Sequence, residues 1–116
     1  MKLFLIPVLA VLSFSACFSP SLPAIDNPTQ LTTDCEPLLQ DAALTTLEKD
    51  KWPDSIKKLN PVMVNKDGQG IYITTFAETG IGARGYVVAH EKPLSTDHYS
   101  ISETSYPDIY RFDFKP

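Results

Sequence analysis

The second half of the chain shows the two-residue hydrophobic period of β-strands. Gly70–Phe76 is rich in β-branched and aromatic residues, and near the C-terminus Tyr110, Phe112 and Phe114 alternate with charged residues. Such alternation places successive side chains on opposite faces of a sheet. The pattern predicts strands at Val62–Val64, Gly70–Phe76, Gly85–His90 and Ser105–Phe114, with a further short strand at Tyr99–Ser102.

The first half predicts two helices. Asp34 is a suitable N-cap, and Pro37 falls in the first turn, where its missing N–H leaves no hydrogen bond unmade. The apolar residues that follow recur at the spacing of one helix face: Leu38, Leu39, Ala42, Ala43 and Thr46. A second, shorter helix is predicted within Trp52–Pro61, which has a proline near each end.

Helices followed by consecutive strands are typical of an α+β fold in which the helices form one layer and the sheet another. We therefore predict one or two N-terminal helices packed on one face of an antiparallel meander sheet of three to five strands. This small domain is expected to occupy residues 34–116.

Residues 1–16 have the layout of a secretory signal peptide: one basic residue, Lys2, then an uncharged apolar run, then small residues. The apolar run is too short to cross about 30 Å of hydrocarbon as a helix. The motif Ser15-Ala16-Cys17 resembles the lipobox of bacterial lipoproteins. That resemblance implies that Cys17 becomes the acylated N-terminus of the mature protein, anchored in a membrane. Because Phe18 and Ser19 follow the cysteine, and not Asp, it also implies an outer-membrane destination facing the periplasm.

The alternative for Cys17 is a disulfide with Cys35, the only other cysteine. An exported location permits such a bond, and it excludes acylation of the same sulfur. If Cys17 is acylated, Cys35 is expected to remain a buried or half-buried thiol in the first turn of a helix.

Between the signal peptide and the domain, residues 17–33 are predicted to form the lipidated N-terminus and a flexible tether. The segment contains three prolines and five Ser or Thr residues, and it has neither helical nor strand periodicity. The alternative is an irregular arm that packs on the domain through Leu22, Ile25 and Leu31.

The stretch GIGARGYV, which starts at Gly80, matches the pattern of the glycine loops that cover nucleotide phosphates. In a dinucleotide-binding fold these glycines precede a helix, whereas here Tyr86-Val87-Val88 continues as a strand. A kinase glycine loop does lie in a hairpin, but too few residues follow Gly85 to build a catalytic lobe. We therefore interpret Ala77–Arg84 as the flexible connection of a β-hairpin and predict no nucleotide binding.

The charge and the remaining reactive residues predict no catalytic, cofactor or metal site. The formal net charge of −4 argues against nucleic-acid binding, which needs a basic surface. His90 and His98, with Glu91, Asp97 and Asp108 nearby, match no ligand spacing of a known metal motif. Cys35 paired with either histidine is a conceivable nucleophile, but no catalytic signature surrounds it.

Five tyrosines are many for so small a domain: Tyr72, Tyr86, Tyr99, Tyr106 and Tyr110. They either cover a thin core or form a protein interface, where tyrosine is favoured. The expected function is that of a lipid-anchored, non-catalytic envelope protein that acts through contacts with an unknown envelope protein. The alternative is a secreted soluble domain with a Cys17–Cys35 disulfide and a weak ligand site near the Gly80–Gly85 loop.

A second resemblance lies in the globular part. The residues Trp52-Pro53, Ile56 and Leu59-Asn60-Pro61, together with Gly70-Ile71-Tyr72-Ile73 and Tyr110, are similar to small exported bacterial domains that carry no assigned role. The similarity implies the α+β fold and no particular activity.

Overall fold

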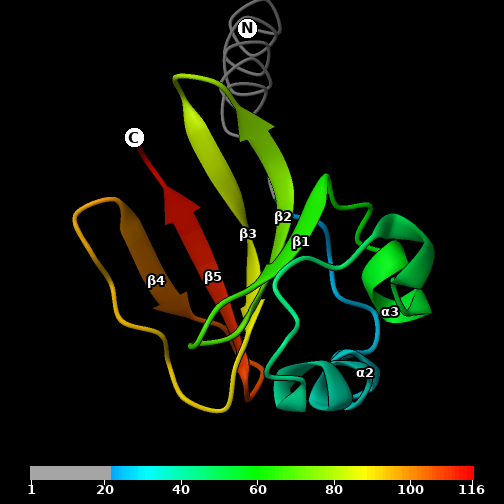
Figure 1. The fold of residues 1–116 in the computed structure, drawn as a ribbon. Coiled ribbons are helices and arrows are strands. Elements are labelled where there is room, and N and C mark those ends of the chain that lie inside the picture. The colour runs from blue at the N-terminus through cyan, green and yellow to red at the C-terminus, as the bar shows by residue number, and fades with distance from the viewer. Residues whose placement is uncertain (1–21) are drawn as a thin grey trace, which may run out of the picture.

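The computed structural model describes residues 22–116 (Figure 1). The signal-peptide prediction, Cys17 and the first part of the predicted tether lie outside these residues. The elements are, in chain order, α2 (Pro28–Gln40), the 3₁₀-helix η1 (Lys49–Lys51), α3 (Asp54–Lys57), β1 (Met63–Lys66), β2 (Ile71–Glu78), β3 (Gly82–Val88), β4 (Tyr99–Glu103) and β5 (Ile109–Phe114).

The predicted α+β class is confirmed. The five strands form one antiparallel sheet in the order β1-β2-β3-β5-β4. The first three strands follow the predicted meander. The chain then passes over the end of the sheet through residues 89–98 and forms β4 at the far edge, and β5 returns to pair between β3 and β4. The last two strands therefore depart from a simple meander.

The main helix begins earlier than predicted. Its N-cap is Asn27, whose Oδ1 accepts a hydrogen bond from the Gln30 N–H at 3.1 Å, and Pro28 occupies the first helical position. An Asn-Pro pair is a strong helix start, because the side chain satisfies a free N–H and the proline has no N–H to satisfy. The prediction of Asp34 as the N-cap is therefore wrong, and Pro37 lies inside the helix.

The helix also ends earlier than the apolar pattern predicted. Asp41 has an extended backbone, and its carboxylate accepts a hydrogen bond from the Ala43 N–H, which is the local competition that ends helices at such residues. Thr46 is not helical: it forms a β-bridge with Asn65, and the Leu47 N–H donates to the Val64 carbonyl. This short segment covers part of the outer edge of β1.

Residues 22–33 pack on the domain, as in the alternative of an anchored arm. Leu31 is buried in the core, and Leu22 and Ile25 pack against the same cluster. The Tyr86 hydroxyl on β3 donates to the Pro23 carbonyl at 2.7 Å. The prediction of a flexible tether up to residue 33 is therefore wrong for residues 22–33, because the three apolar side chains and the hydrogen bond hold this segment on the sheet.

The main core lies between the sheet and the helical segments. Trp52 closes one side of it, with its indole N–H donating to the Leu47 carbonyl at 2.8 Å. This position agrees with the role of core cover that is usual for a lone tryptophan. The buried members of the cluster are Leu31, Cys35, Leu47, Trp52, Ile56, Leu59, Val64, Ile71, Ile73, Tyr86, Val88 and Ile109. Among the described residues, no helix combines the length and the hydrophobicity that a membrane span requires.

Candidate functional site

The sheet carries apolar side chains on both faces, but helices cover only one of them. The second cluster consists of Val87, Ile101 and Phe112, with Tyr72, Ala83 and Tyr110 packed against it. Figure 1 shows α2 and α3 beside the β1–β2 half of the molecule, away from β4. The face that carries the second cluster is called here the open face.

The open face is hollowed into a groove of about 470 Å³. Met63 lies on β1, at one edge of the sheet, and Tyr99 lies on β4, at the other edge, yet both line this groove. The sheet is therefore curved, so that its two edge strands face one cavity. The residues that line the groove are Met63, Asn65, Lys66, Asp67, Gln69, Tyr72, Thr74, Ala77, Ala83, Leu94, Thr96, Tyr99 and Phe112.

Aromatic rings form the floor and one wall of the groove. The ring centroids of Tyr72 and Phe112 are 5.4 Å apart with an interplanar angle of 69°, and those of Tyr72 and Tyr99 are 6.0 Å apart at 63°. The ring centroids of Tyr99 and Phe114 are 4.9 Å apart. Edge-to-face pairs of this kind stabilise one another beyond the burial of their area, so the floor is expected to be rigid.

The Tyr72 hydroxyl stays protonated at neutral pH. Burial raises the pKa of Tyr72 to about 12, and the nearby Asp67 and Tyr99 add to this effect. A neutral phenol both donates and accepts a hydrogen bond. The centre of the groove therefore offers a polar group without a charge.

The two charged residues of the groove are already engaged by the protein. Asp67 Oδ1 accepts hydrogen bonds from the N–H groups of Gln69 at 2.7 Å and Gly70 at 3.1 Å. The Lys66 ammonium group donates to the Asp41 carbonyl. The groove thus presents aromatic and aliphatic surface with a polar rim that includes one carboxylate and one ammonium group, as ligand and peptide sites commonly do.

One rim of the groove is a loop that contains Leu94, whose apolar side chain is exposed to solvent. The Leu94 N–H donates to the Gln69 side-chain oxygen at 2.6 Å, and Pro93 beside it is buried. The Leu94 side chain itself is 75% exposed. The loop is therefore fixed at both residues while it presents a large apolar group at the edge of the cavity.

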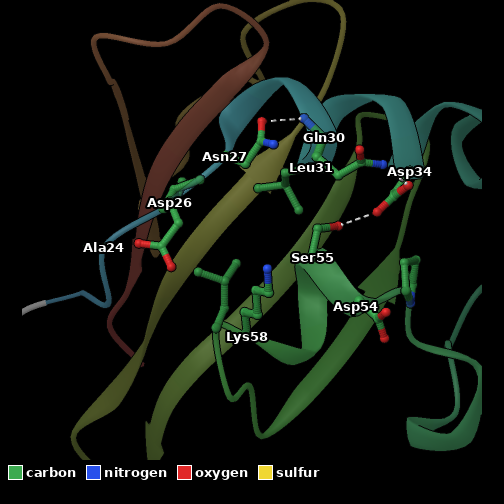
Figure 2. A pocket seen from close by; sticks show the side chains of 12 residues that line it. Ala24, Asp26, Asn27, Gln30, Leu31, Asp34, Asp54, Ser55 and Lys58 are labelled. Carbon is green, nitrogen blue, oxygen red and sulfur yellow. Dashed lines mark hydrogen bonds between the residues drawn. The ribbon is translucent and has the colours of Figure 1, made fainter.

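A second, smaller cavity of about 360 Å³ lies between the arm, α2 and α3 (Figure 2). Three carboxylates and one ammonium group line it: Asp26, Asp34, Asp54 and Lys58. The Asp34 carboxylate accepts from the Ser55 hydroxyl at 2.6 Å and from the Gln30 amide at 2.7 Å, one donor to each oxygen. Asp34 therefore joins the two helices, which is a structural role, and it is not an N-cap.

The GIGARGYV stretch is a β-hairpin, as predicted. The connection is shorter than predicted, since Glu78 pairs with Gly82 and only Thr79–Ile81 lie between the strands. Gly80 has a φ of +81°, a conformation that favours glycine. The shallow hollow beside this loop is lined mainly by small or apolar residues, with Phe114 and Pro116 on its far side.

The two histidines are not brought together. His90 Nε2 lies 3.2 Å from Glu36, and its Nδ1 lies 3.9 Å from Asp108. His98 Nδ1 lies 3.0 Å from the Lys115 carbonyl, and its ring packs near Phe114. Within residues 22–116, no group of three or more His, Cys, Asp or Glu side chains is arranged to hold a metal ion.

Cys35 lies in the middle of α2 and is enclosed in the core, and not in the first turn as expected. Burial raises the pKa of its thiol to about 12, with a further contribution from Asp34. A thiol with such a pKa is protonated at neutral pH and is a poor nucleophile. The position therefore fits a packing role.

This burial predicts a specific loss of stability in alkali. Because the folded protein holds the Cys35 proton more tightly than the unfolded chain, the stabilisation is complete below pH 9 and is lost as the pH rises from 9 toward about 12. We expect Cys35→Ala to lose less free energy of unfolding than the parent between about pH 9 and 10, measured by urea unfolding at a series of pH values.

Tyr72→Phe is the matched control for this measurement. The pKa of Tyr72 rises from 10.0 to about 12, so this variant is expected to differ from the parent in pH dependence only above pH 10. A parent and a Cys35→Ala variant with the same pH dependence between about pH 9 and 10 would contradict the enclosed position of the thiol.

The tyrosines are divided between the two faces. Tyr72 and Tyr99 line the groove, and Tyr110 packs against the cluster beneath it, whereas Tyr86 points to the helical side. Tyr106 lies in the turn between β4 and β5 and is exposed. Two of the tyrosines that the sequence analysis named as either core cover or interface residues thus line the groove, and nothing in the sequence indicated that Met63 and Leu94 lie beside them.

Comparisons of the chain with protein-family models, with curated proteins and with solved structures found no match.

Proposed function

We propose that the chain is a lipid-anchored, non-catalytic envelope protein that binds a partner protein through the groove on its open face. The observation that carries the proposal is the exposure of an aromatic-lined cavity to which all five strands contribute. A solvent-facing apolar hollow of this size, with a polar rim, is typical of an interaction site. The membrane in question is, by the lipobox resemblance, the outer membrane on its periplasmic side.

The anchor rests on the signal-peptide pattern and on the lipobox resemblance at Cys17. The burial of Cys35 supports it indirectly. A disulfide to Cys17 would require the Cys35 sulfur to leave the core, or residue 17 to reach a side chain with no exposed surface. Acylation of Cys17 carries no such cost, because it leaves Cys35 in place.

The chemistry of the groove favours apolar side chains of a protein partner over a charged ligand. Its aspartate and lysine already make hydrogen bonds within the protein, and most of its other lining groups are rings, methyl groups and neutral polar atoms. Aromatic side chains in such positions commonly contribute most of the affinity of protein interfaces. The partner is expected to insert leucine-like or aromatic side chains between Tyr99 and Met63.

Photocrosslinking from two tyrosine positions tests this interface. Tyr99 and Tyr106 are 36% and 38% exposed, but only Tyr99 lines the groove. A photoreactive phenylalanine analogue at position 99 is expected to crosslink the partner in expressing cells, and the same analogue at position 106 is not. In the crosslinking strain, Leu94→Asp is expected to lower the yield from position 99 about tenfold or more, because it places a charge at the apolar rim.

Equal crosslinking from both positions, or a yield that Leu94→Asp leaves unchanged, would contradict the groove as the interface. The same cells test the anchor independently. The mass of the mature N-terminal peptide is expected to show two or three acyl chains on Cys17. A peptide in which Cys17 is disulfide-bonded to Cys35 would contradict the anchor and leave the groove untouched.

A further inference from the structure

The chain leaves the ordered domain close to the proposed acylation site. Leu22 already packs against the core, so only residues 18–21 separate it from Cys17. Five Cα-to-Cα steps span at most about 18 Å when fully extended. An acyl chain on Cys17 therefore holds Leu22 within roughly that distance of the lipid head groups.

The arm approaches the sheet from the side of the β2–β3 hairpin tip. Pro23 is fixed to Tyr86 in the middle of β3, and from there the chain runs to α2, whose Glu36 meets His90 just beyond the end of β3. Figure 1 shows the arm starting beside β2 and β3 and running away from the hairpin tip toward α2. The described arm therefore leads away from the hairpin tip as it runs from Pro23 to α2.

The hairpin tip extends beyond Tyr86 by about the same length as the extended link between Leu22 and Cys17. Ile81 precedes Tyr86 by five residues, which is about 17 Å along a strand. A bilayer that the fully extended link between Cys17 and Leu22 reaches on the side of the hairpin tip therefore lies at the level of the tip. The opposite end of the sheet carries the β4–β5 turn, since Val88 pairs with Ile109 while Ala83 pairs with Phe114.

The chemistry of the tip suits a lipid surface. Ile81 is 60% exposed and is the last residue of the three-residue loop Thr79–Ile81, between Gly80 and Gly82. Phe114 and Pro116 line the hollow beside the loop. An apolar side chain between small uncharged neighbours can enter the boundary between head groups and acyl chains, where buried apolar area contributes binding energy.

We propose that the tip of the β2–β3 hairpin, with the exposed Ile81 beside its turn, contacts the lipid surface that holds the acylated N-terminus. This inference rests on the lipid anchor of the proposed function. The short link orients the domain, so that the hairpin end meets the bilayer and the β4–β5 turn points away from it. The partner would then approach the groove from beside the membrane.

The test uses the acylated full chain in vesicles of phosphatidylethanolamine and phosphatidylglycerol. Single Ile81→Cys and Tyr106→Cys variants are labelled with an environment-sensitive fluorophore, since acylation blocks Cys17 and the core encloses Cys35. Nitroxide-bearing lipids are expected to quench the label at position 81, and its emission is expected to shift to the blue. The label at position 106 is expected to show neither effect.

A third variant carries a flexible Gly-Ser insertion of about 15 residues between Ser21 and Leu22. It is expected to float with the vesicles while the quenching at position 81 falls, because the link no longer restricts the domain. Equal quenching at positions 81 and 106 in floated protein, or quenching at position 81 that the insertion leaves unchanged, would overturn the proposed orientation but not the anchor. Acylated protein that fails to float would overturn the anchor and the orientation together.

Discussion

Leu31→Ala is expected to lower the free energy of unfolding by about 3 kcal/mol. Leu31 lies in the segment whose composition predicts a flexible tether, but its side chain is fully buried between α2 and the sheet. Truncation removes the apolar contacts and leaves a cavity that the other members of the closely packed core cluster cannot fill by small movements. Urea unfolding followed by the fluorescence of Trp52 measures the change.

Thr33→Ala is the control, because Thr33 lies in the same helix two residues away and is exposed. Its expected effect is within about 0.5 kcal/mol. If residues 22–33 were a tether, both variants would have the stability of the parent protein. A loss of less than about 1 kcal/mol for Leu31→Ala would therefore contradict the packed arm.

Gly85→Ala is expected to destabilise the protein by about 3 kcal/mol, for a different reason. Gly85 lies inside β3, and a Cβ atom there would stand 1.9 Å from the Ile73 carbonyl oxygen of β2. Neither group is the end of a flexible side chain, so the two central strands must move apart. Local separation weakens the β2–β3 ladder, and it also disturbs Phe112, whose ring lies 3.0 Å from the same point.

Gly68→Ala is the matched control, since an added Cβ at Gly68 meets no atom within 4 Å. This variant is expected to stay within about 0.5 kcal/mol of the parent. Thermal unfolding by circular dichroism compares the two. Similar melting temperatures for both variants would indicate that β2 and β3 do not approach each other as described.

The strands were predictable because their signal is local. Alternation in Ile71–Phe76 and Ile109–Phe114 is decided by which face each side chain occupies, and neighbouring residues suffice to show it. The boundaries of the helix could not be predicted from neighbouring residues alone. Asp34 has the chemistry of an N-cap, yet Asn27 caps the helix because Leu31 and Cys35 gain more from burial when the helix begins earlier.

The groove could not be predicted from the sequence for a geometric reason. Tyr72 and Tyr99 lie far apart in the chain and on strands that β3 and β5 separate, and they meet because the sheet curves. The hydrophobic period of a single strand indicates neither the order of the strands in the sheet nor the curvature of the sheet. Leu94 likewise has no periodic signal, and it is placed by its hydrogen bond to Gln69.

The position of β5 between β3 and β4 has a consequence for how the molecule is completed during synthesis. β3 has an unpaired edge until residues 109–114 emerge, and β4 has no neighbour in the sheet other than β5. An unpaired edge of this length invites pairing with other chains. Premature termination before Ile109 therefore yields a product that exposes Val87 and the backbone beside it, and that product is a natural target for chaperones and proteases.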